Sequence, residues 1–247
     1  LVVSAALFGV EVAAITVTDL NSLARTIMQT IWGKKRKNMA NEIYFCLIEK
    51  GHVLDPPMKT TYVRLCWLAK AARTRGNIQI AVQACWEQIH PPTTATSLAA
   101  PSPHLSGPTW RALQEAKGLG WATIEGWWEW EVPGMESSLN FVTAPWPSIQ
   151  HEIRESIRRR ELNAVETRRP RLFGGLGASA HRPSILTSIK NCKTELEKTL
   201  LTQVLTGAIW TAARAHERTL RSTPFCPYCE KPNTTQELET EFHLLWE

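Results

Sequence analysis

Aspartate is almost absent from this sequence of 247 residues, because it occurs only at Asp19 and Asp55. Each lies at the start of a segment with helical periodicity, where an aspartate side chain is a typical N-cap. A polymerase or nuclease that uses two metal ions needs several carboxylates that converge on one point. The 21 glutamates form no recognisable cluster in the sequence. The scarcity of aspartate therefore argues against such an active site in this chain.

Other signatures of catalysis are missing as well. The sequence has no Gly-x-Ser-x-Gly elbow and no His-Glu-x-x-His pair, and its seven histidines are scattered. The glycine-rich stretch 173–177 lacks the preceding strand and the closing Lys-Ser/Thr pair of a nucleotide-binding loop, so we interpret it as a hinge. We expect that this chain is not an enzyme.

Long hydrophobic runs and signs of secretion are also lacking. The apolar opening, residues 1–17, is interrupted by Glu11 and has no basic flank. It is therefore too short and too polar for a membrane span and unlike a signal peptide. We expect no membrane partner and an intracellular location, nuclear or cytoplasmic. Because the sequence opens on Leu1 rather than methionine, we also expect a fragment.

The six cysteines favour a reducing compartment and metal binding over disulfides. Two of them form a Cys-x-x-Cys pair, and the other four lie within helix-like patterns, where we expect them to pack in a core: Cys46, Cys66, Cys85 and Cys192.

The net charge of +5 is unevenly distributed. Residues 18–75 contain eleven basic and four acidic residues, and residues 147–182 contain eight and four. The tail, residues 222–247, has one basic and five acidic residues. Basic helices with an acidic tail indicate that nucleic acid would bind to the body of the protein and not to the tail.

Hydrophobic periodicity predicts a mainly α fold of at least six helices, with little sheet beyond the termini. Residues 1–17 fit either a strand or a short buried helix. Helices are predicted over about 18–31, 38–50, 56–75, 78–89, from Pro147 onward, and 192–219, with the first capped by Thr18 or Asp19. The residues expected to face inward are Leu20, Leu23, Ile27, Ile31, Tyr62, Leu65, Ala69, Ala72, Ile149, Ile153, Ile157, Leu196, Leu200, Val204 and Ala208.

The composition suggests four consecutive segments: helical bundle-like residues 1–90, a linker and acidic segment 91–146, basic helices 147–221, and a cysteine-containing tail 222–247. Residues 91–108 are rich in Pro, Ser and Thr, as a linker is. Residues 110–134 contain five tryptophans and a net acidic charge. Tryptophans can stack on bases, but the glutamates would repel phosphate, so packing against a neighbouring element is favoured.

Two groups of basic residues are candidates for nucleic-acid binding. One group is a basic turn, and the other lies on the helix that begins at Pro147 and just beyond its end. Each group could contact phosphates, or could simply be a solvated surface. Glu152, Glu155 and Glu161 could pair with some of the arginines. The candidates are Lys34, Lys35, Arg36 and Lys37 in the turn, and Arg154, Arg158, Arg159, Arg160, Arg168 and Arg169 further on.

The tail has the spacing of a zinc knuckle. Cys226 and Cys229 form the Cys-x-x-Cys pair, and His243 follows fourteen residues later. Structural zinc takes four ligands, and a cysteine one residue past Glu247 would complete Cys-x2-Cys-x13-His-x4-Cys. We therefore expect a zinc site that is incomplete in this chain. The alternative is two ordinary cysteines and a histidine on a helix face.

Several stretches resemble the LINE-type non-LTR retrotransposon reverse transcriptases. Residues 6–12, which contain Leu-Phe-Gly-Val-Glu, are similar to the stretch that follows the catalytic palm in these enzymes. Residues 31–33 and 51–56 are similar to their thumb-side region. Residues 205–210 followed by the knuckle are similar to the C-terminal Cys-Cys-His-Cys region. The match is loose over 91–146.

The resemblance implies that this chain is the region of such a polyprotein that extends from the thumb to the zinc knuckle. Residues 1–90 would then be the thumb-like part. The palm and its paired aspartates are absent, so the RNA-directed DNA polymerase activity of the parent polyprotein is not carried over. What is implied is a non-catalytic accessory role: non-specific binding of RNA or DNA beside the rest of the polyprotein. Two alternatives are a helical protein-interaction scaffold and a decayed retroelement sequence without selected function.

Overall fold

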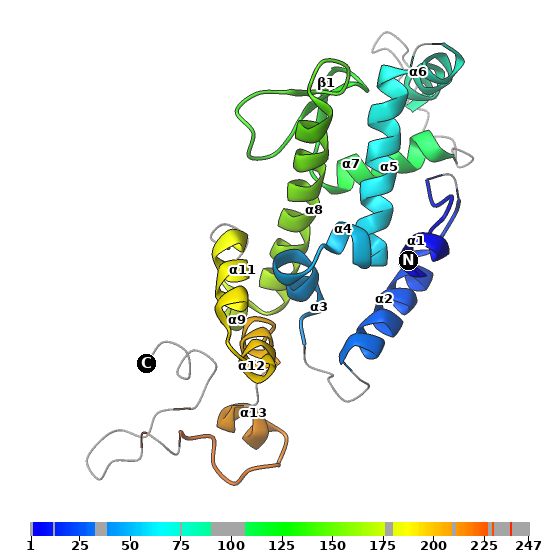
Figure 1. Ribbon diagram of the computed structural model, residues 1–247. Coiled ribbons are helices and arrows are strands. Elements are labelled where there is room, and N and C mark those ends of the chain that lie inside the picture. Colours follow the sequence, from blue (N-terminus) through cyan, green and yellow to red (C-terminus); the bar gives the residue numbers. More distant parts are fainter. Residues whose placement is uncertain are drawn as a thin grey trace, which may run out of the picture. The chain divides into compact units, whose positions relative to one another are not determined.

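Figure 1 shows the computed structural model of the chain, which describes residues 2–11, 13–32, 39–74, 76–89, 107–175, 180–208, 211–226, 229 and 238. The fold is mainly helical, as predicted. The chain forms two compact units: unit 1 comprises residues 1–27 and 50–160, and unit 2 comprises residues 28–49 and 161–247. Unit 1 thus contains residues from three of the four segments that the composition suggested. Most of the predicted linker lies outside the described residues.

Seven helices are described in unit 1, two of which extend past its limits. Among the described residues, no helix has both the length and the apolar character that a membrane span requires. In chain order the helices are α1 (Val2–Ala6), α2 (Val17–Trp32), α4 (Gly51–Leu54), α5 (Pro56–Arg73), α6 (Asn77–Ile89), α7 (Pro108–Gly118) and α8 (Trp146–Arg168).

Helix α5 begins where the sequence predicts. The Asp55 side chain accepts a hydrogen bond from the Met58 backbone N–H at 3.1 Å, and two prolines occupy the first helical positions. Proline suits these positions because its missing N–H would be unpaired there anyway. Helix α7 packs against α5 (Figure 1).

The N-terminal segment is helical, which resolves the choice between strand and helix for its first residues. The cap of α2 differs from the prediction: Thr16, and not Thr18 or Asp19, provides it. The Thr16 hydroxyl accepts from the Asp19 backbone N–H at 3.1 Å and donates to the Asp19 carboxylate at 2.6 Å. Leu20 is buried in a small core with Val10, while Ile31 is exposed, contrary to expectation.

A small antiparallel sheet occupies the tryptophan-rich segment, where no strand was predicted. Its strands are β1 (Ala122–Gly126), β2 (Glu129–Glu131) and β3 (Leu139–Asn140), in the order β1-β2-β3. Strands of two to five residues are too short to establish a period in the sequence. The sheet is small, which agrees with the expectation of little sheet beyond the termini, but its place in the tryptophan-rich segment was not predicted.

Three of the tryptophans are part of the core of unit 1. Trp121, Trp127 and Trp130 are at most 4% exposed, and each indole N–H has a partner. Trp121 donates to the Ser156 hydroxyl at 3.0 Å, Trp127 to the Gln83 side chain at 2.9 Å, and Trp130 to the Trp127 carbonyl at 3.0 Å. The packing interpretation is confirmed for these rings, and base stacking by them is excluded because they are buried.

Helix α8 covers this core with one face. Ile149, Ile153 and Ile157 are fully buried at i, i+4 and i+8, as their spacing predicts. The helix begins one residue before Pro147. Arg154, Arg158, Arg159 and Arg160 of the same helix are half-buried.

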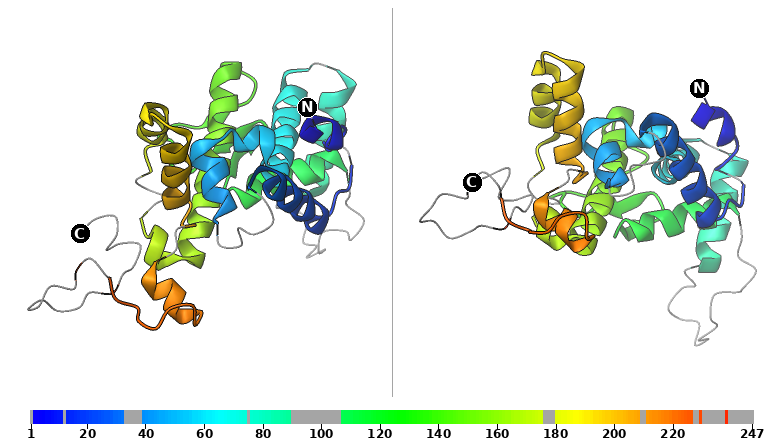
Figure 2. Two further views of the ribbon diagram at one scale, coloured as in Figure 1. Left: turned by 60° about the horizontal axis from the view of Figure 1, so that its bottom comes forward. Right: turned by 90° about the horizontal axis from the view of Figure 1, so that it is seen from below.

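Unit 2 is built around a π-helix, η1 (Tyr44–Ile48), that continues α3 (Asn41–Ile43) and buries four of its side chains. Helices α11 (Arg182–Asn191) and α12 (Glu195–Leu205) lie side by side (Figure 2) and both contact η1. Two short helices, α9 (Pro170–Phe173) and α13 (Ala212–Glu217), complete the described part.

The predicted continuous helix over 192–219 is wrong. The chain forms α12 and α13 instead, because Gly207 adopts a left-handed φ of 66° after α12. The Ala208 N–H donates to the Gln203 carbonyl and the Gly207 N–H to the Val204 carbonyl, which is a Schellman helix end. A glycine is suited to this position because it carries no Cβ.

The buried stripe expected on this helix is also wrong at its first two positions. Leu196 is 68% and Leu200 50% exposed, whereas Thr202 and Thr206 are buried. Both threonine hydroxyls donate to carbonyls one turn earlier in the chain, at 2.8 and 2.7 Å. Because their polar atoms are satisfied locally, these side chains can be buried at little cost.

Candidate nucleic-acid interface and metal ligands

The candidate residues of the basic turn and one metal ligand are not placed by the structure. Lys34, Lys35, Arg36, Lys37 and His243 lie outside the described residues. The other eight candidates, six arginines and two cysteines, are placed and fall into three groups.

The first group is on the part of α8 that belongs to unit 1. The Arg158 Nε donates to the Glu155 carboxylate at 2.9 Å, which is one of the pairings that the sequence left open. Arg159 donates to the Pro133 carbonyl. Arg160 lies 3.9 Å from the Glu115 carboxylate. Arg154, by contrast, forms no ion pair with any carboxylate in the described part of the chain.

Glu115 belongs to a buried network that holds unit 1 together. Its carboxylate accepts from Arg64 at 2.8 Å and from the Thr61 hydroxyl at 2.7 Å. The same guanidinium donates to the carbonyls of Val10 at 3.3 Å and Ala13 at 3.4 Å. Arg64 thus joins α5, α7 and the N-terminal segment, and its role is structural.

The second group is a cluster of guanidinium groups in unit 2. Arg168 donates to the Glu42 carboxylate at 2.8 Å. Burial lowers the pKa of Arg169; Glu42 raises it, and the positive charges of Arg214 and Arg168 lower it further. Three arginines thus lie near one another, and Glu42 lies beside two of them. Arg214 was not among the candidates, because it is far from Arg168 and Arg169 in the sequence and only the fold brings it to them.

A polar cluster between α5 and α8 was also missed. The Tyr62 hydroxyl accepts a hydrogen bond from the Gln150 amide at 2.9 Å, and the His52 ring lies 5.1 Å from the Tyr62 ring. Burial, together with the neighbouring Cys66 thiol, raises the pKa of Tyr62 to about 12. The sequence assigned Tyr62 to a hydrophobic helix face and so did not indicate a polar role.

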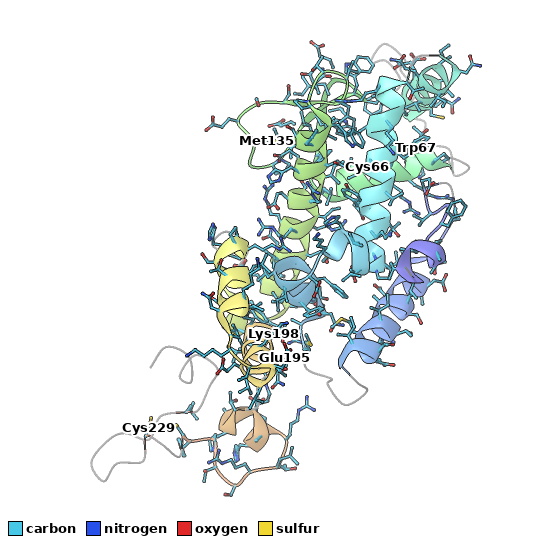
Figure 3. The ribbon with its side chains drawn as sticks, in the orientation of Figure 1. Cys66, Trp67, Met135, Glu195, Lys198 and Cys229 are labelled. Carbon is cyan, nitrogen blue, oxygen red and sulfur yellow. The ribbon has the colours of Figure 1, made fainter. Side chains whose placement is uncertain are left out.

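Cys66, which Figure 3 shows on α5, lies beside this tyrosine. Burial raises the pKa of its thiol, while hydrogen bonding with Tyr62 and the charges of Lys70 and Arg154 act in the opposite direction. The thiol form is favoured, which is the state of a structural rather than a reactive cysteine. Its burial agrees with the core role predicted for it, as does that of Cys46.

The third group is the cysteine pair of the tail. Cys226 is buried beside an isolated antiparallel bridge between Phe225 and Leu238. Cys229 is partly exposed, and its position in the tail is labelled in Figure 3. Among the described residues, no three His, Cys, Asp or Glu side chains form a metal-binding group. Two of the three predicted ligands are thus described, and the zinc site stays a prediction.

The comparisons with known proteins give no relative. No protein-family model, no curated protein and no solved structure matches the chain.

Proposed function

We propose that this chain is a non-catalytic, nucleic-acid-binding accessory region of a reverse-transcriptase-like retrotransposon protein. It binds RNA or DNA without sequence preference, acts inside the cell beside the rest of its polyprotein, and uses zinc at Cys226, Cys229 and His243 to order its tail. The sequence resemblance supports the assignment to this family. The clustered positive charges support the binding of nucleic acid.

The observation that carries the proposal is a cluster of guanidinium groups in unit 2. Arg168 and Arg214 both lie close enough to Arg169 to lower its pKa, and Arg168 pairs with Glu42. Like charges held together are unfavourable until an anion joins them. Phosphate suits this arrangement because guanidinium groups bind it through paired hydrogen bonds. The arginines of α8 in unit 1 add further positive charge.

The first test removes charge from the two candidate groups. A variant with Lys34, Lys35, Arg36 and Lys37 changed to glutamine, and one with Arg168→Gln and Arg169→Gln, are expected to bind a labelled duplex more weakly. The slope of log K against log salt should become shallower by about 0.9 for each phosphate that is no longer neutralised. Fluorescence anisotropy between about 50 and 200 mM salt measures it.

Lys198→Gln is the matched control. Lys198 is an exposed lysine of unit 2 that lies 3.8 Å from Glu195, and both are labelled in Figure 3. Its replacement should leave affinity and slope unchanged. Parent-like binding by both charge-removal variants at every salt concentration would show that the candidate residues are wrong.

A protein-interaction scaffold is the second candidate. It is favoured by the exposed Leu196 and Leu200 on α12, which present apolar surface one turn apart. The buried core tryptophans, in contrast, are not available to a partner. Binding to nucleic acid that does not respond to salt, or no binding at all, would favour the scaffold.

A further inference from the structure

Lys70 and Arg154 are among the cations of unit 1 that have no carboxylate partner among the described residues. Arg64, Arg158 and Arg160 each have a carboxylate nearby. Charges left uncompensated on a protein surface are available to an anionic ligand.

An aromatic ring lies beside Lys70. The Lys70 ammonium is 5.8 Å and the Arg73 guanidinium carbon 5.7 Å from the centre of the Trp146 ring, within the range of cation–π attraction. Trp146 is partly exposed, unlike the three core tryptophans. It is therefore a tryptophan of unit 1 that a base can reach.

The backbone that leads into Trp146 is anchored by Arg73. Arg73 donates to the Phe141 carbonyl at 2.7 Å and to the Ala144 carbonyl. These bonds tie the end of α5 to the turn that leads into Trp146. A fixed ring loses little freedom when a ligand stacks on it, which favours binding.

Lys70 and Arg154 come from different helices. Lys70 lies one turn after Cys66 on α5, and Arg154 lies one turn after Gln150 on α8. The charges of both cations also act on the pKa of the Cys66 thiol. Next to them Gln150 of α8 is bonded to Tyr62 of α5. We call this surface the α5–α8 seam; its members are Tyr62, Lys70, Trp146, Gln150 and Arg154.

We propose that the α5–α8 seam binds single-stranded nucleic acid, with phosphates on Lys70 and Arg154 and a base on Trp146. This inference rests on the proposed function and names the form of nucleic acid that unit 1 takes. Cations beside a ring are the combination that binds unpaired strands, since every base has a face that can stack. In a duplex the bases are stacked on one another and cannot reach the ring.

The test separates the charge from the ring. Lys70→Gln with Arg154→Gln should weaken binding of a labelled single strand and reduce its salt slope by about 1.4, at about 0.7 for each phosphate. Trp146→Leu should weaken the same strand about fivefold or more. It should leave the binding of inorganic polyphosphate, which has no bases, unchanged.

Lys117→Gln provides the control, because Lys117 is an exposed lysine of α7 in the same unit. A far-UV circular dichroism spectrum and a urea unfolding curve like those of the parent show that Trp146→Leu is folded. The seam proposal would be overturned if the Lys70 and Arg154 variant bound the single strand as the parent does, while removal of charge at 34–37 or 168–169 weakened that binding. The proposed function would then remain intact. Equal effects of Trp146→Leu on both ligands would overturn the stacking. An unaltered chain that binds no nucleic acid would overturn both proposals.

Discussion

Replacing Glu115 by alanine is expected to lower the free energy of unfolding of unit 1 by about 3 kcal/mol. The Arg64 side chain is only 9% and that of Glu115 20% exposed, and the carboxylate accepts from both Arg64 and Thr61. Its removal leaves a buried guanidinium without its negative partner. The cost of an uncompensated buried charge far exceeds the cost of a broken pair at the surface.

The matched control is Glu155→Ala. Glu155 pairs with Arg158, but their side chains are 29% and 26% exposed, so its removal should cost less than about 1 kcal/mol. Urea denaturation followed by tryptophan fluorescence measures both variants, because the core tryptophans belong to unit 1. Equal, small decreases for the two variants would contradict the structural role of the Arg64–Glu115 network.

Replacing Cys226 or Cys229 by serine is expected to weaken zinc binding by at least about 100-fold. Loss of a group that only supports a ligand already costs about 10- to 100-fold, and a thiolate is a ligand itself. Competition with a coloured chelator measures the affinity. Zinc should also release protons on binding, since thiolate ligands must lose theirs.

Cys192→Ser serves as the control for this experiment. Cys192 follows α11, its thiol donates to the Ser188 carbonyl at 3.5 Å, and it is not one of the predicted ligands. Zinc affinity should be unchanged in this variant. An equal loss of affinity in Cys192→Ser and Cys226→Ser, or no loss in either, would show that the tail is not a zinc site.

The parts of the fold that the sequence predicts are those set by local signals. Asp55 followed by two prolines fixes the start of α5, and three isoleucines at helical spacing identify the buried face of α8. The end of α12 at Gly207 was missed because an isolated glycine in a helical pattern permits either a continuing helix or a cap. The small sheet was missed because its strands are too short to show a period.

The candidate site was less predictable, because charge can be read from a sequence but pairing cannot. Arg154 and Arg158 look alike in the sequence, yet of the two only Arg158 has a carboxylate partner among the residues that the structure describes. Lys70 and Trp146 are far apart in the chain and meet only in the fold. Long-range contacts of this kind decide which cations are available to a ligand, and no local pattern encodes them.

The most direct test of the central claim is the salt dependence with which the unaltered chain binds a labelled single strand. If Lys70, Arg154 and the arginine cluster of unit 2 supply about four phosphate contacts, the slope of log K against log salt should be about −3. Competition with an unrelated sequence should be equally effective, because phosphate contacts carry no sequence information. A slope near zero, or no binding at low salt, would contradict the account.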